Sequence, residues 1–198
     1  MRTFLRLIVG IKYHNESAFK GLKQFIVVAN HNSHVDAMAL MSAVPPHMLR
    51  KVHPVAAGDY FGKSKLKSFI TRLFVNALLI PRARPVDGKG PDPVQMMLDV
   101  LKKGDSLILF PEGSRGEPEK LQKFKKGVGF LLEKNPHIPF IPVFMQGMGK
   151  VLPKGNGILI PSNTYVLIGD PVFCKTNNVD EIMADVEKSI LSLHTKIS

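Results

Sequence analysis

Short apolar runs alternate with helix-like segments along most of this 198-residue chain. The runs with the length and apolar content of buried strands are residues 7–12, 25–29, 52–56, 76–80, 106–110, 139–144 and 165–168. The segments with helical character are residues 35–43, 65–74, 93–102, 125–134 and 179–196. Strands separated by helices predict an α/β fold, in which a largely parallel sheet is flanked by helices.

The composition is that of one compact globular domain. Hydrophobic residues make up 44% of the chain and charged residues 22%, and no stretch rich in Gly, Ser or Pro separates two domains. We therefore expect a single domain over residues 1–198. Because Cys174 is the single cysteine, an internal disulfide framework is excluded, and the chain fits a reducing compartment.

Basic residues strongly outnumber acidic ones. The formal net charge is +11 and the sequence pI is about 9.8. One basic group comprises Arg50, Lys51, Lys63, Lys65, Lys67, Arg72, Arg82 and Arg84, and a second comprises Lys120, Lys123, Lys125 and Lys126. This excess predicts an anionic partner such as nucleic acid, anionic lipid headgroups or a phosphorylated substrate. No RNA- or DNA-binding module is recognisable, so we expect no nucleic-acid partner.

Membrane contact, if present, is predicted to be peripheral. Arg2 and Arg6 interrupt the apolar start of the chain, which lacks a secretory cleavage site, and no run approaches the roughly 20 apolar residues of a spanning helix. Residues 65–74 combine an apolar stripe with surrounding lysines, as in a helix lying on an anionic membrane, although the pattern favours core packing for the apolar stripe. We expect a location on the cytoplasmic face of a membrane.

An apolar run at residues 25–29 ends just before His31, and Asp36 follows five residues later. On a continuous helix this spacing would turn the two side chains apart. They can meet if His31 lies in a turn and Asp36 in the first turn of the following helix. A histidine that is oriented by a carboxylate has the groups needed to act as a general base.

Two other interpretations of this segment stay open. Ser33 and Asp36 have the spacing of a capping-box variant, so the carboxylate could serve only helix N-terminal amides. Alternatively, His31, His34 and Asp36 could hold a metal ion. Their spacing matches neither of the usual histidine patterns, and no other cluster completes a ligand shell, so no metal is expected.

A second strand runs into a turn that bears Glu112 and Arg115. In a parallel sheet, ligand sites lie outside the carboxyl ends of the strands. His31, Arg82 and Arg115 each follow a predicted strand, so all three are expected at the same edge. A base beside two arginines suits an alcohol substrate that also carries a phosphate, because arginine binds phosphate with a bidentate fork.

Four ordered segments resemble the blocks of the glycerolipid acyltransferase family, whose best-known members are 1-acylglycerol-3-phosphate acyltransferases. They are Asn30-His31-Asn-Ser-His-Val-Asp36, Leu78-Leu-Ile-Pro-Arg82, Phe110-Pro-Glu-Gly-Ser-Arg115 and Ile138-Pro-Phe-Ile-Pro142-Val. The resemblance covers about residues 22–170, ahead of the predicted C-terminal helix at about residues 179–196.

The resemblance implies a peripheral membrane O-acyltransferase in phospholipid biosynthesis. A fatty acyl group would pass from acyl-CoA or acyl-carrier protein, as co-substrate and without another cofactor, to a lysophosphatidic acid-like acceptor. His31 would be the general base and Asp36 its orienting partner. The implied substrate-binding residues are Arg82, Glu112, Gly113, Ser114, Arg115 and Pro142. Pro142 would shape the acyl-donor side, although an edge-strand proline is an alternative interpretation.

Other acceptors, and a function without catalysis, also fit the sequence. The acceptor could be glycerol 3-phosphate, another lysophospholipid or an amino-acid lipid. A non-catalytic binder of anionic lipid also fits the charge, but it does not explain the ordered blocks.

Overall fold

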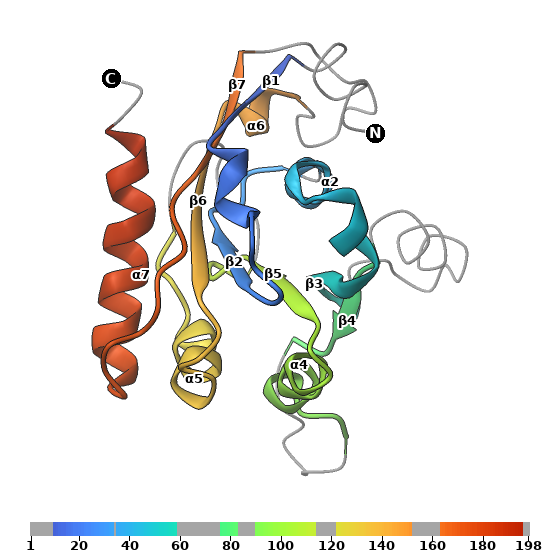
Figure 1. The fold of residues 1–198 in the computed structure, drawn as a ribbon, viewed down its shortest axis with the longest axis vertical. Helices are drawn as coiled ribbons and strands as arrows, with labels where there is room; N and C mark the ends of the chain where they lie inside the picture. The colour runs from blue at the N-terminus through green and yellow to red at the C-terminus, as the bar shows by residue number, and fades with distance from the viewer. Residues whose placement is uncertain are drawn as a thin grey trace.

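The computed structural model describes residues 10–33, 35–58, 76–82, 90–113, 122–151 and 163–195, without the side chain of Lys150. These residues contain a seven-stranded sheet with the order β1-β7-β6-β2-β5-β3-β4 (Figure 1). The strands are β1 (Ile11–His14), β2 (Ile26–Ala29), β3 (Val52–Ala57), β4 (Leu78–Ile80), β5 (Ser106–Leu109), β6 (Phe140–Gln146) and β7 (Thr164–Ile168).

The sheet is largely parallel. Strand β2 pairs in parallel with both β5 and β6, β3 pairs in parallel with β5 and β4, and only the β6–β7 pair is antiparallel. Strand β1 continues the sheet in parallel with β7. The predicted α/β fold with a largely parallel sheet flanked by helices is therefore confirmed.

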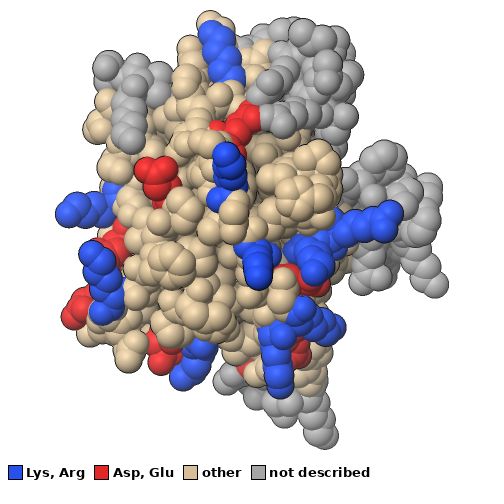
Figure 2. All heavy atoms as spheres, viewed as in Figure 1, with Lys and Arg blue, Asp and Glu red and all other residues tan. Residues whose placement is uncertain are grey.

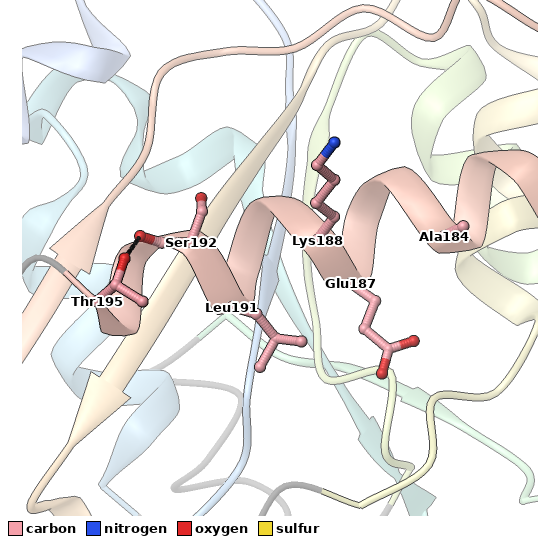
Figure 3. Close-up of a pocket in the computed structure, with 6 residues that line it drawn as sticks. All are labelled: Ala184, Glu187, Lys188, Leu191, Ser192 and Thr195. Atoms are coloured by element: carbon pink, nitrogen blue, oxygen red, sulfur yellow. Dashed lines mark hydrogen bonds between the residues drawn. The ribbon is translucent and has the colours of Figure 1, made fainter.

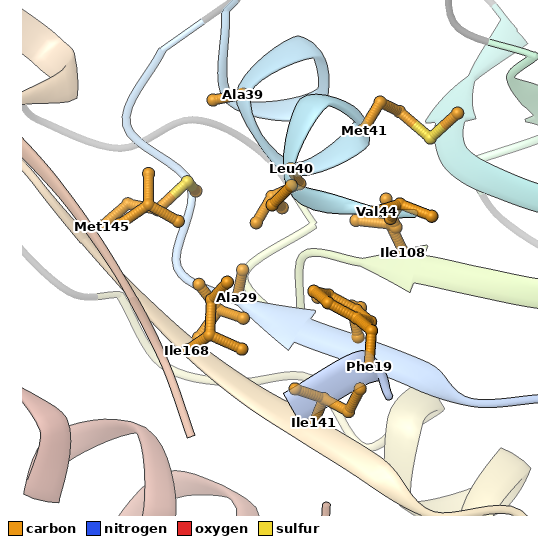
Figure 4. Packing of buried hydrophobic residues seen from close by; sticks show 14 of the residues in the cluster. Phe19, Ala29, Ala39, Leu40, Met41, Val44, Ile108, Ile141, Met145 and Ile168 are labelled. Atoms are coloured by element: carbon orange, nitrogen blue, oxygen red, sulfur yellow. The ribbon is translucent and has the colours of Figure 1, made fainter. Parts of the chain in front are cut away.

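Helices cover both faces of the sheet. They are α2 (Asp36–Ala43), α4 (Pro93–Lys102), α5 (Gly127–Lys134), α6 (Met148–Val151) and α7 (Val179–His194), with 3-10 helices η2 (Glu16–Phe19) and η3 (Pro46–Lys51). Val27 and Ala29 pack with α2 on one face, as Figure 4 shows for Ala29. Ile26 and Val28 pack with α4, α5 and α7 on the other. Because both faces are covered, every residue of β2 is apolar and buried.

Side-chain caps fix where two helices begin. Asp92 accepts a hydrogen bond from the backbone N–H of Val94 at 2.9 Å, and Pro93 occupies the first turn of α4. Asn178 accepts from the first-turn amides of α7 at 2.9 and 3.3 Å. These contacts satisfy amides that have no partner within their own helix.

The predicted elements match the described ones closely, with a few differences. The first strand lies at Ile11–His14 rather than residues 7–12, and residues 7–9 and the predicted 65–74 helix lie outside the described residues. Helix α5 begins at Gly127 rather than residue 125, and the N–H of Lys125 donates to the carbonyl of Pro111, 2.8 Å away. The helices η2, η3 and α6 were not predicted, because each is too short to show a helical period.

No helix in the described part of the chain combines the length and apolarity needed to span a membrane.

Candidate active site

Strands β2 and β5 lie side by side, but the chain leaves them toward opposite faces of the sheet. After β2 it enters α2, which packs on the face of Val27, whereas the helix that follows β5 is α5, which packs on the face of Ile26. In α/β proteins, such a reversal marks the place beyond the carboxyl ends of the strands where ligands bind. His31 follows β2 here, and the Phe-Pro-Glu-Gly turn follows β5.

His31 and Asp36 meet as predicted. The Nδ1 atom of His31 lies 2.9 Å from Asp36 Oδ2. Because a carboxylate only accepts hydrogen bonds, this contact places the imidazole proton on Nδ1 and leaves the Nε2 lone pair to accept a proton. The His31 side chain is 20% exposed and Asp36 is fully buried. No described residue hydrogen-bonds to Nε2, so this atom can face a substrate.

The same carboxylate also holds the turn that precedes α2. Asp36 Oδ2 accepts from the backbone N–H groups of Asn32 and Ser33 at 2.7 and 2.8 Å. The capping-box interpretation is not borne out, because the N-cap of α2 is Val35, and Ser33 Oγ is buried without a hydrogen-bond partner among the described residues. Support of the turn and orientation of the imidazole therefore coexist in one side chain.

The alternative metal site at His31, His34 and Asp36 includes His34, which lies outside the described residues. Among the residues that are described, no group of three or more His, Cys, Asp or Glu side chains is arranged to hold a metal ion.

Two residues of the turn after β5, Phe110 and Glu112, also contact His31. The Phe110 ring stacks on the imidazole, with centroids 4.1 Å apart and planes 22° from parallel. Glu112 Oε1 accepts the backbone N–H of His31 at 2.8 Å, and its Oε2 accepts the N–H of Gln122 at 3.2 Å. The ring and main chain of His31 are thus fixed by residues about 80 positions away. Neither contact was predicted, because no local sequence pattern indicates it.

Glu112 is only 2% exposed. Burial raises the pKa of this carboxyl, and the hydrogen bonds from the His31 and Gln122 amides offset the increase only in part. With both oxygens bonded to backbone amides, Glu112 is well placed to join the two loops.

Two asparagines attach the His31 loop to β6. The buried Asn30 side chain donates to the Met145 carbonyl at 2.8 Å and accepts the Met145 N–H at 2.7 Å, as a neighbouring peptide group would. Asn32 donates to the same carbonyl at 3.2 Å. These contacts continue the β2–β6 pairing past Ala29, and they too were not predicted.

The predicted substrate-binding residues are only partly brought together. Glu112 and Gly113 lie beside His31, and Gly113 has a φ of 71°, in the region that favours glycine. Arg82 is exposed just beyond β4, at the same sheet edge. Pro142 is buried within β6 opposite Val28, so it is not an edge-strand proline. Ser114 and Arg115 lie outside the described residues.

A surface depression elsewhere does not belong to this site. It follows the outer side of α7, on the sheet face opposite α2, and all its lining residues come from that helix (Figure 3). They are Ala184, Glu187, Lys188, Leu191, Ser192 and Thr195. None of them contacts His31 or the turn after β5. The basic side chains on the face seen in Figure 2 are scattered, with acidic side chains between them.

Comparison with known proteins agrees with this geometry. Residues 10–146 match the Acyltransferase family model. The chain is 28% identical over 153 residues to the chloroplastic 1-acyl-sn-glycerol-3-phosphate acyltransferase BAT2 of Brassica napus, covering 75% of this chain and 40% of that protein. It is 22% identical over 172 residues to the 1-acyl-sn-glycerol-3-phosphate acyltransferase of Bacillus subtilis, covering 87% of this chain and 78% of that protein.

A solved structure shares the fold. It is the crystal structure of the 1-acyl-sn-glycerophosphate (LPA) acyltransferase PlsC from Thermotoga maritima, which matches with a TM-score of 0.77 and 22% identity, covering 100% of this chain and 76% of that one. The chain spans about two fifths of the length of BAT2 and of the chloroplastic relative LPAT1 of Arabidopsis thaliana. Since the family match covers more than half of the chain, including both the His31 segment and the Phe-Pro-Glu-Gly turn, the chain belongs to the acyltransferase family.

Proposed function

We propose that this protein transfers a fatty acyl group from the thioester of acyl-CoA or acyl-carrier protein to the free hydroxyl of a lysophosphatidic acid. The observation that carries the proposal is the imidazole of His31, bonded to Asp36 through Nδ1 and open at Nε2, at the carboxyl edge of the sheet. The names of the plant and Bacillus subtilis relatives support this acceptor.

In the proposed reaction, His31 Nε2 accepts the proton of the acceptor hydroxyl as its oxygen attacks the thioester carbonyl. The Asp36 carboxylate, 2.9 Å from Nδ1, stabilises the imidazolium that forms. Collapse of the tetrahedral intermediate breaks the carbon–sulfur bond, and His31 returns the proton to the thiolate that leaves. A base positioned in this way typically contributes about 10²–10⁴-fold in rate.

This mechanism uses direct attack by the acceptor and needs no acyl-enzyme intermediate. Cys174 is half-buried in the cluster beneath α7, on the sheet face opposite α2. Burial raises the pKa of its thiol, with a smaller contribution from Asp185, so that the thiolate form is disfavoured. Cys174 is therefore not a suitable nucleophile.

We place the reaction at the anionic cytoplasmic face of a membrane, to which the protein binds peripherally. The net charge of +11 favours such a surface, and the reaction would serve phospholipid biosynthesis.

The decisive experiment presents the purified chain with lysophosphatidic acid in vesicles that contain phosphatidylglycerol, with acyl-CoA or acyl-carrier protein as donor. Mass spectrometry of the lipids should show phosphatidic acid from the wild type and almost none from His31→Ala. Glycerol 3-phosphate and other lysophospholipids in parallel reactions identify the acceptor. Near-normal turnover by folded His31→Ala would refute the mechanism, and vesicle binding without acyl transfer to any acceptor would favour a lipid-binding protein.

A further inference from the structure

Lys125 is folded back onto the turn that follows β5. Its backbone N–H donates to the carbonyl of Pro111 at 2.8 Å, and the N–H of Gln122 is held by Glu112. The turn itself is closed by the Gly113 N–H, which donates to the carbonyl of Phe110 at 3.0 Å. These bonds fix the main chain of Lys125 beside the turn, although the two are far apart in sequence.

The side chain of Lys125 then crosses Gly113. A Cβ built on Gly113 would lie 2.6 Å from Lys125 Nζ and 2.9 Å from its Cε. The ammonium group therefore fills the space that any other residue at position 113 would need. Because Phe110 stacks on His31 and Glu112 binds its backbone, the cation lies against the same turn that contacts the proposed general base.

No carboxylate in the described part of the chain forms an ion pair with Lys125. The acid of the described turn, Glu112, uses both oxygens for backbone amides. The next residue behaves differently, because Lys126 Nζ lies 2.6 Å from Asp180 Oδ1. Of two consecutive lysines, one is thus paired with α7 and the other lies against Gly113 in the turn after β5.

We infer that Lys125 binds the phosphate of the acceptor, an inference that rests on the proposed function. In lysophosphatidic acid the phosphate and the free hydroxyl can lie on adjacent glycerol carbons, so a cation for the phosphate must lie next to the base. The ammonium group provides donors and a full positive charge for the phosphate oxygens. The glycine leaves room for the lysine chain and for close approach of the substrate.

The chain offers a matched control for the test. Lys125→Met and Lys126→Met remove the same charge from adjacent positions, but only the first removes the cation beside Gly113. We expect the KM for lysophosphatidic acid to rise about tenfold or more in Lys125→Met, equivalent to at least about 1.4 kcal/mol. Lys126→Met should leave it unchanged, and Lys125→Arg should restore most of the loss. Equal effects of the two methionine variants would overturn the inference.

Phosphate groups also occur on acyl-CoA and on anionic membranes, so two further measurements identify the source. In Lys125→Met, the KM for acyl-CoA should stay at the wild-type value. Binding to vesicles that contain phosphatidylglycerol should fall by the same small factor in both methionine variants. A change in donor KM specific to Lys125→Met, or a loss of vesicle binding specific to it, would assign the lysine to the donor or to the membrane and overturn the inference.

A binding measurement separates this inference from the proposed reaction. Calorimetric titration with glycerol 3-phosphate needs no turnover, and its Kd should rise about tenfold in Lys125→Met only. If the wild type transferred no acyl group but bound glycerol 3-phosphate through Lys125, the proposed function would fail while the phosphate site stood. Unchanged affinity in Lys125→Met would overturn the phosphate site.

Discussion

Replacing Asp36 with asparagine separates the two roles of this carboxylate. Asp36 Oδ2 accepts hydrogen bonds from His31 Nδ1 and from the backbone amides of Asn32 and Ser33. The side-chain oxygen of asparagine can still accept from the two amides and so keep the turn before α2. It carries no charge, however, and cannot stabilise an imidazolium as a carboxylate does. The variant therefore tests whether catalysis needs more than support of this turn.

The expected loss of stability is moderate. Exchanging charged for neutral acceptors costs about 1 kcal/mol for each of the two amide bonds. The new NH₂ group would lie where Asp36 Oδ1 is buried without a hydrogen-bond partner among the described residues, which adds about 1–3 kcal/mol. The free energy of unfolding should thus fall by about 3–5 kcal/mol. Turnover of the folded enzyme should fall by about 10²–10⁴-fold, the contribution of an oriented general base.

The assay combines urea unfolding with kcat per folded molecule, measured well below the Tm of each variant. Ser33→Ala is the control, because its buried hydroxyl has no hydrogen-bond partner in the described part of the chain. It should change neither stability nor kcat appreciably. If folded Asp36→Asn turned over at nearly the wild-type rate, the carboxylate would only hold the turn before α2, and the base assigned to His31 would lose its support.

Other substitutions test the surroundings of the site. Because burial raises the pKa of Glu112, the folded protein binds the carboxyl proton more tightly than the unfolded chain does. Deprotonation of Glu112 therefore lowers the free energy of unfolding as the pH rises from the ordinary carboxyl pKa through the raised pKa of the folded protein. Glu112→Gln should flatten that fall in urea unfolding at mildly acidic to neutral pH. Phe110→Leu removes the ring stacked on His31 and should lower stability by about 0.5–1.5 kcal/mol and kcat several-fold, measured by thermal unfolding and acyl transfer. Gly129→Ala puts a Cβ 2.9 Å from Met183 Cγ and should cost about 1–3 kcal/mol by thermal unfolding, with kcat per folded molecule unchanged.

The buried strands were predictable because each is an apolar run covered on both faces, as β2 shows. The edge strand β1 was misplaced by a few residues, because only Ile11 of its residues is buried and the rest of Ile11–His14 is polar or partly exposed. The order of the strands was not predictable from the runs alone. It depends on which faces the connecting helices cover, and local patterns do not encode this.

The site was predictable to the extent that it is local. The contact between His31 and Asp36 follows from a turn and the first turn of a helix, both within a few residues. The contacts of His31 with Phe110 and Glu112 depend on β5 lying next to β2. The position of Lys125 over Gly113 depends on the chain returning to the same turn. The sequence order predicted that His31 and the turn with Glu112 share one edge of the sheet, but it did not predict which side chains contact each other there.

A second histidine–carboxylate pair shows that the edge of the sheet at which a pair lies affects its possible function as much as the residue types do. His53 lies near the start of β3, with Nε2 3.2 Å from Asp105 Oδ2 and Nδ1 3.1 Å from the carbonyl of Asn76. Both ring nitrogens are occupied, and Asp105 precedes β5, so this pair lies at the amino edge of the sheet. His31 has one nitrogen without a partner in the described structure and lies at the carboxyl edge, where the chain leaves β2 and β5 toward opposite faces. A free nitrogen can accept a proton only where a substrate can reach it, so of these two described pairs the one at His31 suits the proposed general base.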